Sequence, residues 1–308
     1  MMQRPVPLIR GLWCATLTPV TRDGAIDHRR FAAHVHSLFA QGVDGIAPFG
    51  TTGEGQSFAA DERSAGLDAL LAAGVPAARI VAGTGCAALP ETIALTRHAV
   101  AAGCIGCLVL PPFFWKDVTD DGLYGWYADL IERVADPRLR LFLYHLPQVS
   151  SVPLSPGLVA RLGTAFPDVV AGVKDSEGNW AHTSALLAAA PRLTIVIGHE
   201  PHLPRLIRAG GAGTICGVAN IYPGLVRALL APTVSPDDEA RIVQFIEIAF
   251  RQPFLAAFKS MVADRLHDPE WRHVRAPLVA LDDAQRRALR AALDGAGFPA
   301  AAAMQPAV

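Results

Sequence analysis

Short apolar segments alternate with amphipathic segments over most of this 308-residue chain. The apolar segments carry few polar residues on either face, which indicates strands that are covered on both sides. The segments between them have apolar residues at helical spacing, for example Phe31, Val35 and Leu38. This alternation predicts a parallel sheet covered by helices. The predicted strands are residues 11–18, 45–49, 79–85, 104–110, 141–144, 169–174, 193–197 and 213–218.

Eight strand–helix units fit an α/β fold of the (β/α)₈ TIM barrel type best, and we assign residues 1–231 to it. A doubly wound open sheet is the alternative. It would need a glycine-rich phosphate-binding turn after the first strand, where this chain has Thr16-Leu17-Thr18-Pro19. Residues 232–296 begin with an acidic helix start and predict a C-terminal helical extension packed on the barrel. Residues 297–308 are rich in alanine and proline and are expected to form a flexible tail.

The composition narrows the class of protein. The formal net charge is −1, so the chain lacks the basic surface with which proteins bind nucleic acid or acidic membranes. No apolar run reaches the ~18 residues that a transmembrane helix needs. The first five residues do not begin a signal peptide. We therefore expect a cytoplasmic protein.

The cysteines and histidines do not form a metal-site pattern. The five cysteines are odd in number and widely scattered, which argues against a disulfide framework. Cys104 and Cys107 match C-x-x-C, but they lie in a predicted strand, where residues three apart face opposite sides. The segment His199-Glu200-Pro201-His202 lacks the helical i, i+4 histidine pair of the zinc proteases. We predict no metal site.

Lysine is rare in this chain, and one lysine is unusually placed. The 27 basic residues include only Lys116, Lys174 and Lys259. Lys116 and Lys259 have charged or polar neighbours and could lie on the surface. Lys174 closes an apolar strand, where desolvation lowers the pKa of an ammonium group. An unprotonated lysine can attack a carbonyl and form a Schiff base, although a lysine that only caps a strand and reaches to water is the alternative.

Other polar residues stand at the predicted strand ends, where barrels of this kind collect their functional groups. The segment from Gly50 to Glu54 offers two hydroxyls and a run of backbone N–H groups that could bind a small carboxylate. The alternative is an ordinary strand-to-helix loop. The phenol of Tyr144 can move a proton at a reacting carbon, or it fills the barrel with its hydroxyl paired. The candidates are Thr51, Thr52, Tyr144, Lys174, Ser176, Gly198, His199, Glu200 and Asn220.

Taken in order, these segments resemble the dihydrodipicolinate synthase/N-acetylneuraminate lyase superfamily of class I Schiff-base lyases, over residues 11 to 296. The resemblance implies a (β/α)₈ barrel, usually in a homotetramer, and no metal or organic cofactor. It also implies that Lys174 forms a Schiff base with pyruvate or another 2-keto acid. Thr51 and Thr52 would hold the carboxylate, and Tyr144 would relay protons. The segments that carry the resemblance are Gly50-Thr51-Thr52-Gly53-Glu54, Tyr144-His145-Leu146-Pro147, Gly172-Val173-Lys174-Asp175, Gly210-Gly211-Ala212-Gly213 and Ala219-Asn220.

The departures from the family pattern concern the second substrate. The synthase branch has an arginine that binds the second carboxylate where this chain has Val149, and a tyrosine from across the dimer interface where it has Phe114. Glu200 stands alone where sialic-acid lyases use an acidic pair. Lys174-Asp175-Ser176 is similar to the keto-deoxy-sugar-acid and 4-hydroxy-2-oxoglutarate aldolases.

The sequence therefore predicts a lyase that cleaves or dehydrates a pyruvate-derived 2-keto acid, with a 2-keto-3-deoxy sugar acid as the favoured substrate. Ser176, Glu200 and Asn220 would then face the distal hydroxyls. The alternatives are the synthase reaction itself, a sialic-acid lyase-like reaction, and a keto-acid sensor without turnover.

Overall fold

The computed structural model describes residues 8–298. Its eight strands form one parallel sheet in the order β2-β1-β8-β7-β6-β5-β4-β3. A parallel bridge between Ile46 and Ile80 joins the two ends of this order, so the sheet is nearly closed. The predicted (β/α)₈ barrel is confirmed. The strands are β1 (Gly11–Cys14), β2 (Gly45–Ile46), β3 (Val81–Gly83), β4 (Gly106–Val109), β5 (Leu141–His145), β6 (Val170–Asp175), β7 (Thr194–Ile197) and β8 (Gly213–Cys216).

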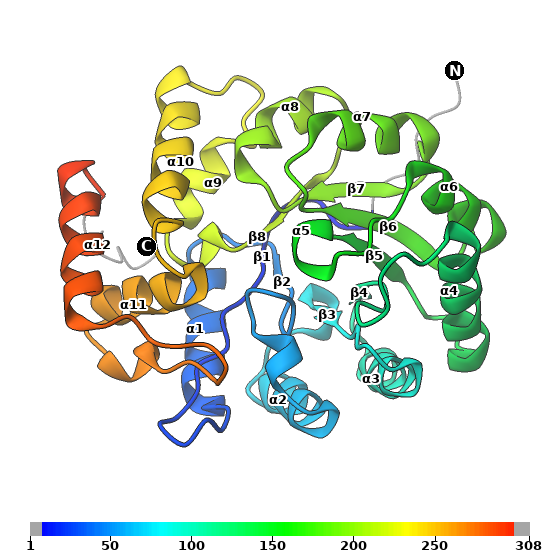
Figure 1. Cartoon of the computed structure of the whole chain (residues 1–308), viewed down its shortest axis with the longest axis horizontal. Coiled ribbons are helices and arrows are strands. Elements are labelled where there is room, and N and C mark those ends of the chain that lie inside the picture. Colours follow the sequence, from blue (N-terminus) through cyan, green and yellow to red (C-terminus); the bar gives the residue numbers. More distant parts are fainter. Residues whose placement is uncertain (1–7, 299–308) are drawn as a thin grey trace.

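The helices surround the strands, and the last three lie together on one side (Figure 1). Short 3₁₀ turns follow several strand ends, among them Gly55–Ser57, Glu200–His202 and Val218–Asn220. The helices are α1 (His28–Ala40), α2 (Ala60–Ala72), α3 (Leu89–Ala101), α4 (Asp120–Val134), α5 (Pro147–Ser150), α6 (Pro156–Ala165), α7 (Trp180–Ala189), α8 (Leu203–Arg208), α9 (Pro223–Ala228), α10 (Pro236–Ala249), α11 (Phe254–Leu266) and α12 (Asp283–Gly295).

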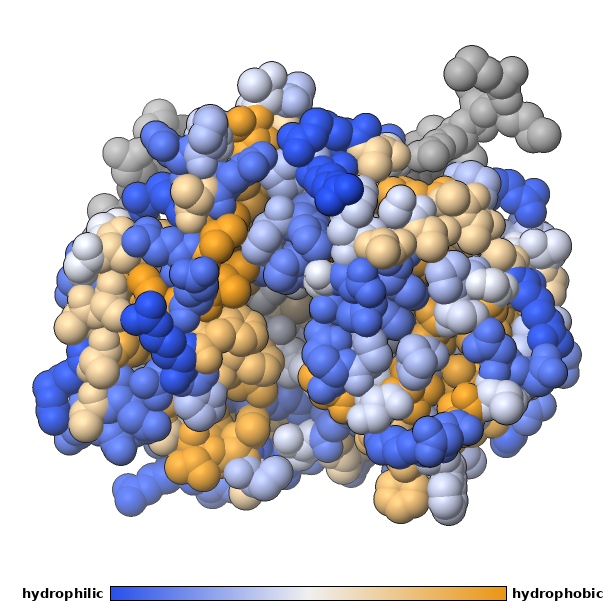
Figure 2. Space-filling view, turned by 45° about the horizontal axis from the view of Figure 1, so that its top comes forward, coloured by the Kyte–Doolittle hydropathy of each residue, from blue (hydrophilic) through white to orange (hydrophobic). Residues whose placement is uncertain are grey.

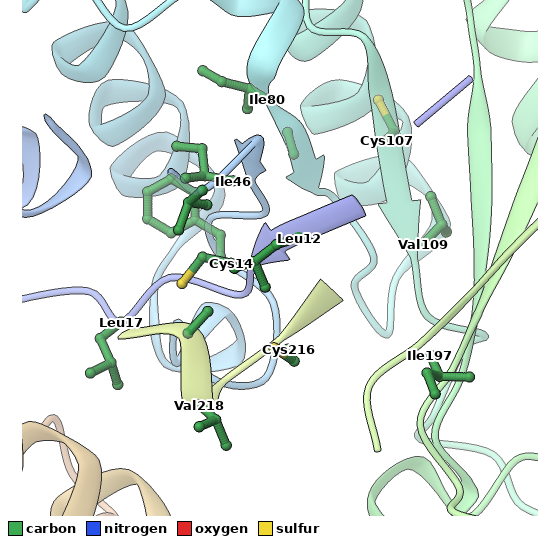
Figure 3. Packing of buried hydrophobic residues seen from close by; sticks show 14 of the residues in the cluster. Leu12, Cys14, Leu17, Ile46, Ile80, Cys107, Val109, Ile197, Cys216 and Val218 are labelled. Atoms are coloured by element: carbon green, nitrogen blue, oxygen red, sulfur yellow. The ribbon is translucent and has the colours of Figure 1, made fainter. Parts of the chain in front are cut away.

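Alternate residues of each strand pack on opposite sides of the barrel wall. On β5, Phe142 and Tyr144 belong to the apolar cluster inside the barrel, whereas Leu141 and Leu143 belong to the cluster between the strands and the helices. This alternation follows from the two-residue period of a strand. Figure 3 shows part of the outer cluster, with residues from β1, β2, β4, β7 and β8. Tyr144, two positions after Phe142, therefore points toward the barrel axis.

Five strands, β1 to β4 and β8, end earlier than the sequence predicts, and the early ends of β2 and β8 shape the site. β2 ends at Ile46, and the chain then turns at Phe49, which has a φ of 59°. The Phe49 ring packs against Phe31 and Phe58, with centroids 5.8 and 6.3 Å apart. β8 ends at Cys216. In both places the residues after the strand form part of the cavity described below.

The C-terminal region corrects two sequence-based expectations. Lys259, which we expected at the surface, is completely buried on α11. Phe298 is also buried and packs against Phe245 and Tyr222, so a flexible tail does not begin at residue 297. The remainder of the predicted tail, residues 299–308, lies outside the described residues. Among the residues that the structure describes, no helix is long and apolar enough to cross a membrane.

Candidate active site

Lys174 and Tyr144 lie side by side at the carboxyl end of the barrel. The register of β5 and β6 pairs Tyr144 with Lys174. Both residues occupy strand positions whose side chains face the inside of the barrel, since side chains along a strand alternate between its two faces. Lys174 Nζ donates a hydrogen bond to Tyr144 Oη at 3.2 Å. The Lys174 side chain is only 3% exposed. A buried amine is thus held beside a phenol that can exchange protons with it, an arrangement suited to an activated nucleophile.

The loop after β2 brings Thr51 to the same phenol. Thr51 Oγ1 lies 3.4 Å from Tyr144 Oη, and Thr52 is largely buried next to it. The loop folds back closely on its own start: a Cβ on Gly55 would lie 1.9 Å from the carbonyl oxygen of Phe49. Only glycine fits there. The hydroxyls therefore come from a tightly folded loop.

One cavity of about 510 Å³ connects most of the predicted residues. It opens at the carboxyl end of the barrel, between the strand ends and the C-terminal helices. The predicted residues that line it are Thr51, Thr52, Tyr144, Lys174, Ser176, Gly198, His199, Glu200 and Val149.

Ser176 and Gly198 shape the space around the lysine. The Ser176 hydroxyl is buried and has no hydrogen-bond partner within the described protein. A Cβ on Gly198 would lie 2.1 Å from Ser176 Oγ and 3.1 Å from Lys174 Cε. The glycine thus leaves room for both side chains. Because buried hydroxyls normally have a partner, Ser176 Oγ is available to a bound molecule.

Glu200 supplies a buried carboxyl on the same wall. Its side chain is 5% exposed, and its Oε1 accepts a hydrogen bond from Val218 N at 3.3 Å. Burial raises the pKa of this carboxyl, and the positive charge of Lys174 acts in the opposite direction. The raised pKa favours the protonated form of this carboxyl more than in an exposed glutamate.

Asn220 and Phe114 lie outside the cavity lining. Asn220 Oδ1 accepts hydrogen bonds from Leu17 N at 3.0 Å and His34 Nε2 at 2.9 Å, and its Nδ2 donates to Ala15 O at 2.8 Å. These bonds join the turn after β8 to the end of β1 and to α1. Phe114 is 68% exposed and packs on Trp115. Asn220 is bonded to protein groups and does not line the cavity, which does not support its predicted contact with the substrate. Phe114, at the position where the synthase branch has a tyrosine that acts across the dimer interface, is exposed on this chain.

The C-terminal helices contribute a wall of the cavity that is absent from the sequence-based predictions. Ile246 on α10, Phe250 at its end, and Phe254 and Phe258 on α11 also line the cavity. The spacing of Phe254 and Phe258, four residues apart, indicates a shared helix face, which Phe250 joins from the turn before that helix.

A histidine pair lies directly behind the Lys174 strand. His145, Asp175 and His182 have potential metal-ligating atoms within 4.8 Å of one another, but the ring nitrogens have protein partners. His182 contacts Asp175 Oδ2 at 3.1 Å and Leu154 O at 2.9 Å. His145 Nδ1 accepts a hydrogen bond from Leu154 N at 3.0 Å, and its Nε2 lies 3.3 Å from Glu177.

The charge state of the pair follows from these contacts. Burial lowers the pKa of His182, but its bonds to Asp175 and to the Leu154 carbonyl outweigh this effect and raise it. Burial and the neighbouring His182 lower the pKa of His145. The two rings stack 3.9 Å apart at 15°. The cluster is therefore a hydrogen-bonded support for β5 and β6, in which a protonated His182 stacks on a neutral His145.

Comparisons with known proteins agree with this geometry. The model of the dihydrodipicolinate synthetase family matches residues 8–296. An uncharacterized DapA-like lyase of Chloroflexus aurantiacus is 34% identical over 295 residues, which cover 92% of this chain and 96% of that protein. Among solved structures, dihydrodipicolinate synthase from Agrobacterium tumefaciens has a TM-score of 0.87 and 38% identity, and covers 92% of this chain and 98% of its own.

A second solved structure is YagE from Escherichia coli K12, a member of the same family in complex with pyruvate. It has a TM-score of 0.85 and 25% identity, over 94% of this chain and 99% of its own. The match of the family model extends over both the barrel and the C-terminal helices. The chain belongs to the dihydrodipicolinate synthetase family of Schiff-base lyases.

Proposed function

We propose that this protein is a class I lyase in which Lys174 forms a Schiff base with pyruvate or a pyruvate-derived 2-keto acid. The observation that carries the proposal is the 3.2 Å contact between Lys174 Nζ and Tyr144 Oη in a buried cavity. The pyruvate complex of the related YagE also supports this class of ligand. The chemistry uses the substrate imine itself and needs no metal or organic cofactor.

The residues have distinct roles in the proposed reaction. Thr51 and Thr52 hold the carboxylate of the 2-keto acid. The Lys174 amine attacks the keto carbon, and Tyr144 transfers the protons with which the carbinolamine loses water. The resulting protonated imine withdraws electrons from C3.

Bond cleavage then follows from this electron sink. When Tyr144 accepts the proton of a C4 hydroxyl, the C3–C4 bond breaks, an aldehyde leaves, and the electron pair remains on C3 as an enamine. Protonation of C3 and addition of water release pyruvate and restore Lys174. If a hydroxyl on C4 leaves as water after loss of a C3 proton, the same imine supports dehydration.

Two candidate reactions follow from the neighbouring residues. The unpartnered Ser176 hydroxyl and the buried Glu200 support a hydroxyl on the substrate close to the reacting carbons, as in the 2-keto-3-deoxy sugar acid that the sequence favours. The synthase reaction, which the name of the Agrobacterium structure suggests, is the second candidate. Val149 lines the cavity where the synthase branch is expected to have its carboxylate-binding arginine, and this argues against that reaction.

The quaternary state and cellular location belong to the same proposal. We infer a homotetramer that acts in the cytoplasm, because the family resemblance implies that assembly. A keto-acid sensor without turnover is the alternative from another class. It does not require a nucleophile beside a proton carrier, so the Lys174–Tyr144 contact argues against it.

Borohydride reduction in the presence of pyruvate tests the proposal. Reduction of the imine should attach the pyruvate carbon skeleton to Lys174, which peptide mass mapping identifies. The Lys174→Ala variant should remain unmodified, and Lys116→Ala, which removes an exposed lysine, should react like the wild type. An unmodified Lys174 in protein with a native circular-dichroism spectrum would overturn the proposal.

A further inference from the structure

The cavity has two chemically different sides. The strand ends supply Lys174, Ser176 and Glu200, whereas the C-terminal helices supply mainly apolar side chains, Ile246, Phe250, Phe254 and Phe258, together with the exposed Glu247. Figure 2 shows a hollow near the middle of this face, with apolar surface toward the C-terminal helices and hydrophilic surface opposite. We call the three phenylalanines, 250, 254 and 258, the aromatic wall.

The aromatic wall extends from the carboxylate loop to the mouth of the cavity. At its inner end, a Cβ added to Gly217 would touch both Phe258 Cε2 at 3.0 Å and Thr52 Oγ1 at 3.3 Å, so these two residues flank the same point. Phe258 is 2% exposed, and Phe250 at the outer end is 58% exposed. The wall thus follows the direction in which a substrate extends from its carboxylate.

The three rings of the aromatic wall pack against one another. Phe250 and Phe254 stack with centroids 5.4 Å apart and ring planes at 3°. Phe258 meets Phe254 edge-to-face at 6.0 Å and 89°. A third planar group can extend this arrangement, since aromatic pairs gain from offset stacking and edge contacts beyond the burial of their area.

The polar side chains that line the outer cavity are Gln148, Glu177, His199 and the exposed Glu247, and two of them, Gln148 and Glu177, are bonded to protein groups. Gln148 Nε2 donates to the Ser176 carbonyl at 2.7 Å, and Glu177 faces His145 at 3.3 Å. The exposed Val149 adds a further apolar surface. A polyhydroxylated chain would place hydroxyls against the aromatic wall without hydrogen-bond partners, and their desolvation would weaken binding.

We propose that the substrate group beyond C4 is apolar and planar, such as an aryl group, rather than a sugar chain. The protein would then cleave a 4-hydroxy-2-keto acid with an aryl group on C4 into pyruvate and an aryl aldehyde, or join the two in reverse. The C3–C4 bond breaks, and the C4 hydroxyl becomes the aldehyde carbonyl as its proton passes to the enzyme. The inference rests on the proposed Schiff-base function. It keeps the C4 hydroxyl of the sugar-acid candidate and replaces the sugar chain beyond C4 with an aryl group.

Imine formation provides a test that does not depend on turnover. Borohydride trapping at increasing concentrations is compared for 2-oxo-4-phenylbutyrate and 2-oxobutyrate, which differ by the phenyl group. Half-maximal trapping of the phenyl compound should need a concentration at least about tenfold lower, since an aromatic ring is withdrawn from water. In the aldol direction with pyruvate, benzaldehyde should give a higher kcat/KM than glyceraldehyde.

Variants distinguish the contribution of the aromatic wall to substrate preference from the formation of the Schiff base at Lys174. Phe250→Ser/Phe254→Ser should abolish the preference for the phenyl compound, so that both acids reach half-maximal trapping at similar concentrations. Val279→Ser, at an exposed apolar residue outside the cavity, should keep both the preference and the trapping of pyruvate at Lys174. Equal trapping of the two acids by the wild type, or a higher kcat/KM with glyceraldehyde, overturns the inference and leaves the Schiff-base function standing. Failure to trap even pyruvate overturns the proposed function itself.

Discussion

Lys259 and Glu54 form an ion pair in which neither side chain is exposed to solvent. The pair joins α11 to the loop that carries Thr51 and Thr52. Lys259 Nζ also donates to His273 O at 2.9 Å, and Glu54 Oε2 accepts from Arg275 N at 3.1 Å. Burial lowers the pKa of Lys259, and the Glu54 carboxylate opposes this effect. The contact therefore ties the C-terminal helices to the proposed carboxylate site.

Loss of one partner of this pair should destabilise the protein strongly. Lys259→Met leaves the Glu54 carboxylate buried without a counter-charge, which should lower the free energy of unfolding by about 3–5 kcal/mol. Urea unfolding followed by circular dichroism measures the change. In the double variant Glu54→Gln/Lys259→Met no buried charge remains, and most of the loss should be recovered. A single variant within about 1 kcal/mol of the wild type would contradict this account of the pair.

Removal of the Tyr144 hydroxyl should affect the rate more than the binding of the keto acid. Tyr144→Phe keeps the ring inside the barrel but deletes the oxygen that Lys174 and Thr51 contact. If the hydroxyl transfers protons, kcat should fall by about 10²–10⁴-fold. Steady-state assays of pyruvate release measure kcat, and borohydride trapping checks that Lys174 still reacts, though more slowly. An unchanged kcat would show that another group carries the protons.

The sequence predicts the barrel and its reactive lysine because both depend on local patterns. Apolar strands, helical periodicity and polar strand ends are visible along the chain, and the period of two places Lys174 and Tyr144 on the inner face. The ion-pair or hydrogen-bond partner of a buried side chain cannot be identified from the sequence when it comes from a distant segment. The burial of Lys259 cannot be predicted from its sequence neighbours, because its counter-charge, Glu54, comes from a distant part of the chain. The sequence likewise predicts Asn220 as a substrate contact, but its amide oxygen accepts hydrogen bonds from Leu17, in the loop after β1, and from His34 on α1, both distant in the sequence.

A methyl group at position 198 should displace the reactive lysine. In Gly198→Ala the new Cβ would meet Ser176 Oγ at 2.1 Å and Lys174 Cε at 3.1 Å. Since a misplacement of about 1 Å in a site can cost about 10²-fold in rate, we expect kcat/KM to fall by about that factor with the fold retained.

A double variant tests the cause of that loss. Gly198→Ala/Ser176→Ala removes the oxygen that makes the closest contact, so it should be more active than Gly198→Ala even though Ser176→Ala alone is less active than the wild type. Purely additive losses in the double variant would mean that the clash with Ser176 is not what displaces Lys174.

The buried His34 should make the protein sensitive to mild acid. Its Nε2 donates to Asn220 Oδ1 at 2.9 Å, and burial lowers the pKa of His34 to about 4. The unfolded chain, with an ordinary histidine pKa of about 6.5, takes up a proton between about pH 6.5 and pH 4 that the folded protein does not. The free energy of unfolding should therefore fall by up to about 3 kcal/mol from this group as the pH is lowered from 7.5 to 4. Urea unfolding at both pH values should show a smaller decrease for His34→Gln, which keeps an amide donor for Asn220 but does not titrate, and equal decreases for the variant and the wild type would rule out His34 as the source.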